Sequence, residues 1–180
     1  MKGQDINLEQ MEQVINEIFP GLTMYVRDVN LSPVCAEKYE LDMIIKERGF
    51  TDASNRVMGM VTTHRFAILS NHMADFRLYE HGTNWGLFVA QSGSHFKVLD
   101  VYRFRDRTQI TLLHLPDDER WKMFENVKIS IEDQITEMAR KRFEAKSVME
   151  PLQELSTKVW LDRCASPLGM DGYGNLFEKE

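Results

Sequence analysis

The residues that decide the fold run from Val57 to Leu115, and they contain VTTHRFAIL (61–69), FRLYE (76–80), WGLFVAQ (85–91), HFKVLDVYRFR (95–105) and TQITLLHL (108–115). β-Branched and aromatic residues dominate these runs, and apolar residues alternate with polar ones in 95–105, which is typical of strands. Short polar turns separate most of them. Because a parallel crossover needs about a dozen residues or more, the short turns predict an antiparallel β-meander.

Helical patterns lie on both sides of this region. In residues 8–19 the apolar side chains recur with a period near 3.6, behind a capping Asn7 and before the stop at Pro20-Gly21. We expect a strand over 23–29, a helix over 36–48 and a loop over 51–55. Further helices are expected after Pro116 and from Ser130 and Ser156. The predicted fold class is α+β: an antiparallel β-meander sheet of about five strands, an N-terminal helix and a C-terminal helical section, in one domain over 1–180.

Composition bounds the class of protein. The 180 residues are 43% hydrophobic and 28% charged, which is ordinary for a globular chain and excludes a mainly disordered one. No apolar run reaches the ~18 residues that a membrane span needs, and the polar start has no secretory h-region. The two cysteines, Cys35 and Cys164, are far apart and outside any CxxC pair. Reduced thiols and a cytoplasmic location are therefore the expectation.

The net charge of −6 is unevenly distributed. Residues 61–115 carry six basic and four acidic side chains, whereas the segments before and after carry six against ten and ten against fourteen. An acidic chain has no general attraction for nucleic acid, so a nucleic-acid ligand is disfavoured. The simplest explanation of the basic middle is a set of strands that exposes alternating arginine and threonine to solvent.

All five histidines lie in the same middle third, with acidic residues near them. Imidazole and carboxylate are the ligands of catalytic zinc, which needs about three protein ligands and an open position. Neighbouring strands lie about 4.8 Å apart, so a sheet could bring such ligands onto one face. The candidate metal ligands are His64, His72, Asp75, His81 and His95. His114 alternates with leucines and fits a strand face. The spacing matches no known ligand signature, so solvated or buried histidines are the competing interpretation.

Three arginines recur at every second position, Arg103, Arg105 and Arg107. If one strand continues through them, they share a face, and their guanidinium groups suit a carboxylate or phosphate partner. Tyr102 and Phe104 would then lie on the opposite face and belong to the core. These arginines and Trp85 are the candidate binding residues, with a solvated strand face as the alternative.

No motif specifies one chemistry. The sequence lacks GxSxG, a Walker A loop and GxGxxG, and both cysteines fit inert packing. The function expected from these absences is a non-catalytic, protein-binding regulatory domain of the inhibitor or adaptor kind, without a cofactor. The alternative is a metal-dependent hydrolase that uses the His/Asp cluster in residues 64–114, with a divalent metal such as zinc as its cofactor. Whether the chain is an enzyme, and its oligomeric state, stay undecided by the sequence.

Overall fold

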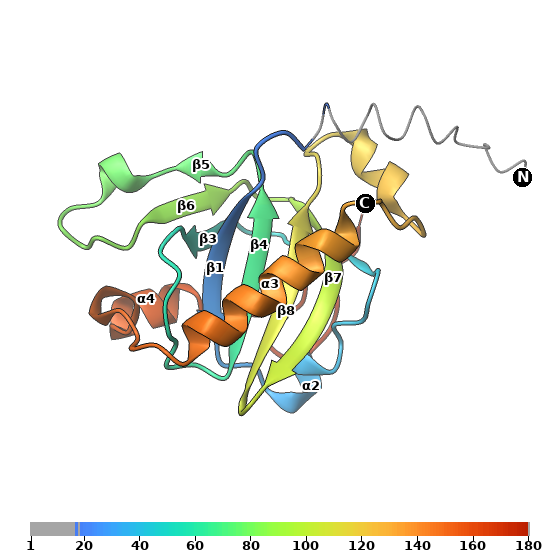
Figure 1. Cartoon of the computed structure of the whole chain (residues 1–180). Coiled ribbons are helices and arrows are strands. Elements are labelled where there is room, and N and C mark those ends of the chain that lie inside the picture. The colour runs from blue at the N-terminus through green and yellow to red at the C-terminus, as the bar shows by residue number, and fades with distance from the viewer. Residues whose placement is uncertain (1–16, 18, 180) are drawn as a thin grey trace, which may run out of the picture.

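A computed structural model describes residue 17 and residues 19–179, and its centre is one eight-stranded sheet (Figure 1). The strands are β1 (Thr23–Val29), β2 (Ile44–Lys46), β3 (Thr51–Ser54), β4 (His64–Ser70), β5 (Ala74–Asp75), β6 (Leu87–Ala90), β7 (His95–Phe104) and β8 (Arg107–His114). Their order across the sheet is β2-β7-β8-β4-β1-β3-β6-β5. The chain therefore leaves and re-enters the sheet several times.

One neighbouring pair of strands is parallel. β4 and β8 run side by side from His64↔Thr108 to Leu69↔Leu113, and their arrowheads point to the same edge in Figure 1. The other ladders are antiparallel. The residues that follow β4 and the residues that follow β8 consequently meet at one edge of the sheet.

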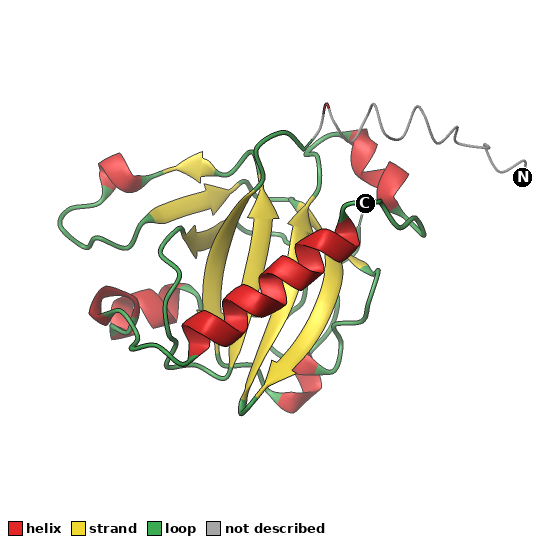
Figure 2. Ribbon diagram, in the orientation of Figure 1, coloured by secondary structure: helices red, strands yellow, loops and turns green. Residues whose placement is uncertain are grey.

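The two faces of the sheet are covered differently (Figure 2). The long helix α3 (Glu132–Ser147) lies across one face, where Ile135 and Ala139 pack on Leu69 and Leu113. The short helix α2 (Pro33–Ala36) and the residues around Leu168 and Met170 cover the other face. Burying apolar side chains on both faces is what stabilises a sheet of this kind.

Short helices make up the remaining elements. They are η1 (Arg77–Tyr79), η2 (Glu119–Phe124) and η3 (Gln153–Leu155), all 3₁₀, and α4 (Lys158–Arg163). The side chain of Asp118 caps η2, and that of Thr157 caps α4, which satisfies backbone N–H groups that would otherwise lack partners. Among the described residues, no helix is long and apolar enough to cross a bilayer.

The predicted five-stranded antiparallel meander is wrong, because the sheet is mixed and has eight strands. The argument from short turns fails between β6 and β7, which are close in sequence but do not pair. β6 pairs with β3, and β7 pairs with β2 and β8. Only the pair Val26↔Ser54 joins β1 to β3, so a weak junction separates the two parts of the sheet.

Some of the helices and strands predicted from the sequence are present in the structure, and others are not. The strand expected over 23–29 is β1, and the C-terminal helices form close to their predicted starts.

The helix expected over 36–48 is wrong: α2 ends at Ala36, and Ile44–Lys46 becomes β2 because it pairs with β7. The loop expected over 51–55 is instead β3. The strand expected over 76–80 is largely η1. The predicted N-terminal helix lies outside the described residues.

Candidate functional site at the carboxyl ends of β4 and β8

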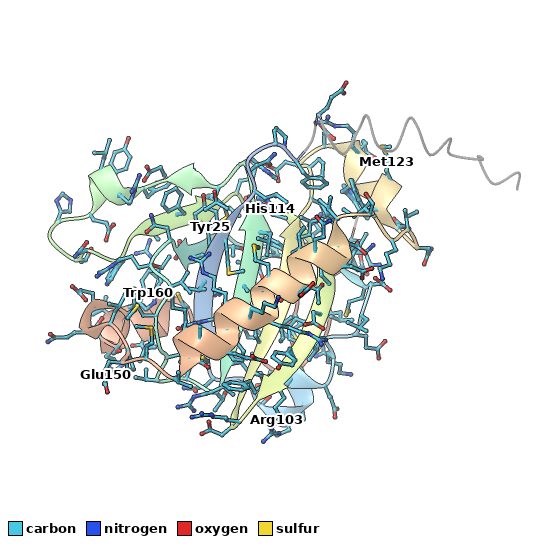
Figure 3. The ribbon with its side chains drawn as sticks, viewed as in Figure 1. Tyr25, Arg103, His114, Met123, Glu150 and Trp160 are labelled. Atoms are coloured by element: carbon cyan, nitrogen blue, oxygen red, sulfur yellow. The ribbon has the colours of Figure 1, made fainter. Side chains whose placement is uncertain are left out.

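The candidate site lies where the two parallel strands end. β4 ends at Ser70 and is followed by His72, while β8 ends at His114 and is followed by Asp117. Figure 3 shows His114 at the edge of the sheet to which both strands point. Sites at the carboxyl ends of parallel strands are common in sheets that contain them, because side chains from separate segments converge there.

His114 is the buried centre of this cluster. Its side chain has no solvent-accessible surface. Nδ1 lies 2.7 Å from Ser70 Oγ, and Nε2 lies 3.2 Å from Ser94 Oγ. The ring also stacks on Phe96, with centroids 4.9 Å apart. A buried imidazole held at both nitrogens and on its face has one available orientation.

His72 also stacks on His114. The two ring centroids are 3.8 Å apart and the planes differ by 21°. The side chain of His72 is 28% exposed, so this ring lies between the buried network and solvent. Burial lowers the pKa of His72 below its ordinary 6.5, and the neighbouring His114 lowers it further, against the opposing effects of Asp117 and the Leu115 carbonyl. His72 is therefore neutral at pH 7.

Asp117 faces both histidines. Its Oδ2 lies 3.5 Å from His72 Nε2, and its Oδ1 lies 3.5 Å from His114 Nε2. Burial alone would raise the pKa of Asp117, but hydrogen bonding and charge from His114, together with His72 and Ser94, lower it overall. The carboxylate is thus ionised at neutral pH and presents lone pairs to both rings.

Hydrogen bonds settle which nitrogen of His72 carries the proton. Nδ1 lies 2.9 Å from Asn71 Oδ1, and the amide nitrogen of Asn71 donates to the Pro20 carbonyl at 3.3 Å. Since an amide oxygen only accepts, Nδ1 holds the proton of the neutral ring. Nε2 consequently points a lone pair toward the carboxylate of Asp117, so two acceptors face each other.

A cavity of about 430 Å³ opens next to this cluster. Its lining residues are Glu17, Asn71, His72, Pro116, Asp117, Asp118 and Arg120. Three of these carry carboxylates and one carries a guanidinium group, and Arg120 is paired with Asp118 at 2.8 Å. The charge of the lining favours a cation over an anion.

The cluster of His72, His114 and Asp117 is the one group of three potential metal ligands among the described residues whose ligand atoms all lie within 4.8 Å of one another. Of the residues expected to bind metal, only His72 belongs to it. His114 and Asp117 were not among them, because strand alternation explained His114 and no sequence spacing links 72 with 114. Their meeting follows from the parallel pairing of β4 and β8, which the predicted meander excluded.

The other predicted metal ligands are scattered. His64 begins β4, with Nδ1 2.8 Å from Thr63 Oγ1. Asp75 forms a bidentate pair with Arg77, whose hydrogen bonds lower the pKa of Asp75 to about 2. His81 is exposed in the loop after η1. His95 stacks on Trp121, with centroids 4.0 Å apart, and its Nε2 lies 3.0 Å from the Lys179 carbonyl. The structure does not bring these residues together.

The predicted binding residues also separate. Arg103 is in β7, Arg105 is in the turn with a φ of 56°, and Arg107 begins β8. They line the tip of a hairpin and do not share one face of a continuous strand. Figure 3 shows Arg103 far from His114. Trp85 lies elsewhere, beside α4, with its ring 5.2 Å from that of Trp160.

No known protein-family model matches the sequence, and no curated protein is similar to it. Several solved structures align with part of the chain. HopU1, an ADP-ribosyltransferase of Pseudomonas syringae pv. tomato DC3000, aligns at 14% identity and a TM-score of 0.47, over 52% of this chain and 45% of its own. The type III effector XopAI from Xanthomonas axonopodis pv. citri also aligns at 14% identity and 0.47, over 54% and 43%. Exoenzyme S from Pseudomonas aeruginosa, solved with human 14-3-3 protein beta and carba-NAD, aligns at 11% and 0.46, over 74% and 70%.

The chain spans less than half the length of HopU1 and XopAI. These partial likenesses place no residue of the site in a known role. They do correct two expectations: the similar structures include ADP-ribosyltransferase toxins and effectors, not non-catalytic adaptors or metal-dependent hydrolases. Neither the non-catalytic protein-binding function nor the metal-dependent hydrolase is retained.

Proposed function

We propose that this chain binds a divalent transition-metal ion through His72 Nε2, His114 Nε2 and a carboxylate oxygen of Asp117. The observation that carries the proposal is that Asp117 presents one oxygen to each ring, with Oδ2 3.5 Å from His72 Nε2 and Oδ1 3.5 Å from His114 Nε2, and that one ligand atom from each residue lies within 4.8 Å of the other two. Ligand atoms around a tetrahedral zinc ion are about 3.3–3.4 Å apart, given zinc–ligand distances of about 2.0–2.1 Å. A cation between them would also resolve the opposition of lone pairs at His72 and Asp117.

The donor set favours zinc. Two neutral imidazoles and one carboxylate suit zinc or a similar borderline metal better than magnesium or calcium, which prefer oxygen ligands. The second contacts of both histidines fit the same role, because ligand histidines usually donate their other N–H to an oxygen. Asn71 accepts from His72, and the Ser70 hydroxyl can accept from His114. Because the two rings are stacked, the His72 ring would rotate so that its Nε2 and His114 Nε2 bind the same ion.

Three protein ligands leave one tetrahedral position open. The cavity lined by Pro116, Asp118 and Arg120 lies on the solvent side of His72 and Asp117. The proposal is metal binding with an accessible coordination position, and it does not extend to hydrolysis.

The test is titration of zinc into chelator-treated protein by calorimetry. We expect one site per chain, and we expect Asp117→Asn to weaken binding by at least about tenfold, because the amide supplies no charge. His81→Ala is the matched control, since it removes an exposed histidine outside the cluster. Equal binding by Asp117→Asn and His81→Ala would refute the site.

Two broader expectations stay proposals beside this one. A protein partner is supported by the exposed arginines of the β7–β8 hairpin, and a cytoplasmic location by two cysteines that are buried and unpaired. The single domain over 1–180 is likewise a proposal.

A further inference from the structure

A second cavity, of about 400 Å³, lies between the loop that follows η1 and the start of α4. Its lining residues are Gly82, Thr83, Trp85, Gln153, Glu154, Thr157 and Val159. None of them belongs to the metal-ligand cluster. In Figure 3 the neighbouring Trp160 lies well away from His114. Cavities of this volume are the size that small organic ligands occupy.

The loop wall of this cavity is held in one conformation. The carboxylate of Glu80 accepts from Thr83 Oγ1 at 2.8 Å and from the backbone N–H groups of Trp85 and Leu87. Three residues of the loop are left-handed: Gly82, Asn84 and Gly86, with φ of 81°, 50° and 67°. A Cβ on Gly86 would come within 2.2 Å of Asn55 Oδ1. Such a wall is organised before any ligand arrives, which reduces the entropic cost of binding.

Contacts with residues outside the loop also hold Trp85 in place. Its ring packs against that of Trp160, which is 1% exposed, with centroids 5.2 Å apart. Ser54 Oγ donates to the Trp85 carbonyl at 2.6 Å. The Trp85 side chain is thus only partly buried although its neighbours anchor it. Arg163 also lies over the Trp85 ring, with Cζ 5.5 Å from its centroid. A ligand ring would therefore stack on the part of this partly buried indole that Trp160 and Arg163 leave uncovered.

Apolar and polar groups meet in this cavity. Val159, which is 66% exposed, provides a second apolar surface beside Trp85. Glu154 supplies a carboxylate and Gln153 an amide oxygen, both hydrogen-bond acceptors. Arg56 contacts Glu154 at 3.5 Å with the same Nη1 that donates to the Asn84 carbonyl at 2.6 Å, so this pairing is the longer of its two contacts. The Asn84 side chain also hydrogen-bonds to this carboxylate, so a ligand ammonium would compete with Arg56 and Asn84 for it.

We propose that this cavity binds a small aromatic amine, with its ring against Trp85 and Val159 and its ammonium group at Glu154. The combination of a tryptophan and a carboxylate recognises organic cations through stacking, cation–π attraction and an ion pair. The inference is independent of the metal site, because the two cavities share no residue.

The test uses phenethylamine as the probe on metal-free protein, with the indole N–H signals followed by two-dimensional NMR. The Trp85 signal is assigned by its loss in Trp85→Leu. We expect a saturable shift of the Trp85 signal, and we expect Trp85→Leu to weaken binding, measured by calorimetry, by about fivefold. 2-Phenylethanol and n-propylamine each lack half of the recognised group and should bind more weakly.

The charge is tested separately, since Trp85→Leu could disturb the loop. Glu154→Gln should weaken phenethylamine two- to fivefold, about the worth of one exposed ion pair, and leave 2-phenylethanol unchanged. Glu150→Gln, an exposed carboxylate outside the cavity lining, is the matched control. Absence of a saturable Trp85 shift, or equal weakening by Glu150→Gln and Glu154→Gln, would overturn the proposal.

Discussion

The two ends of β8 carry polar side chains in opposite situations. At its carboxyl end, His114 is fully buried and contacts Ser70, Ser94 and His72, which are distant in sequence. At its start, Arg107 and the turn residue Arg105 are at the hairpin tip, and their contacts are neighbours in sequence. A side chain positioned by distant segments has one geometry, whereas one that contacts its neighbours keeps its freedom. The fixed geometry of His114 is therefore suited to holding a metal ligand in place.

The largest expected difference comes from removing one polar side chain at each place: His114 in the buried network and Arg103 at the hairpin tip. His114→Ala should lower the free energy of unfolding by about 2–4 kcal/mol in metal-free protein, because it leaves a cavity and removes a buried partner of Ser70 and Ser94. Arg103→Ala should change it by no more than about 0.5 kcal/mol, as exposed substitutions usually do. Urea denaturation in the presence of a chelator measures both. A loss from His114→Ala as small as that from Arg103→Ala would mean that the His114 network adds no stability.

Adding the metal should sharpen the difference between the two ends. A ligand that binds only the folded chain stabilises it by about 2.7 kcal/mol at one hundred times its dissociation constant. We therefore expect zinc to raise the midpoint of thermal unfolding of the wild type and of Arg103→Ala. Asp117→Asn, with affinity at least about tenfold weaker, should show at most about half of this stabilisation. An equal rise in all three would place the zinc outside the proposed cluster.

A third prediction compares two histidines that have similar neighbours. His72 Nδ1 contacts Asn71 Oδ1 at 2.9 Å, and His64 Nδ1 contacts Thr63 Oγ1 at 2.8 Å at the other end of β4. Asn71→Ala should weaken zinc binding by about 10–100-fold, the usual effect of losing a group that orients a ligand histidine. Thr63→Ala, its matched control, should leave zinc affinity unchanged. Calorimetry on both variants decides whether orientation of His72 matters.

The sequence predicts the strands and helices that depend on a local pattern of residues. Alternation and β-branched residues identify β1, and Pro116, Ser130 and Ser156 predict helices that begin close to 119, 132 and 158. The prediction fails where pairing with a distant strand determines the local structure. Ile44–Lys46 has helical periodicity but pairs with β7, because the edge of a sheet offers hydrogen bonds that a helix propensity of a few tenths of a kcal/mol cannot outweigh.

The candidate site depends on the same kind of pairing. His72 could be proposed from its residue type, but His114 and Asp117 join it only because β4 and β8 run parallel. Short turns favour antiparallel neighbours, so the sequence argument placed His114 on an ordinary strand face. The arginines show the converse error. Period-two spacing put them on one strand, but a two-residue turn at Arg105 and Asp106 divides them.

The smallest expected effect comes from protons, and it again separates the two ends of β8. The pKa of His72 and the pKa of Asp117 both lie below their ordinary values, so neither needs to release a proton to bind zinc at pH 7. Affinity should therefore change little between pH 8 and pH 7. It should weaken as the pH falls below 6.5, by about tenfold per pH unit once His72 is protonated. The hairpin arginines are not part of the proposed site and should not contribute to this profile. Zinc titrations at several pH values, with His81→Ala as the control, measure the profile. An affinity that already falls between pH 8 and pH 7 would mean that a metal ligand takes up a proton in this range, contrary to the lowered pKa values of His72 and Asp117.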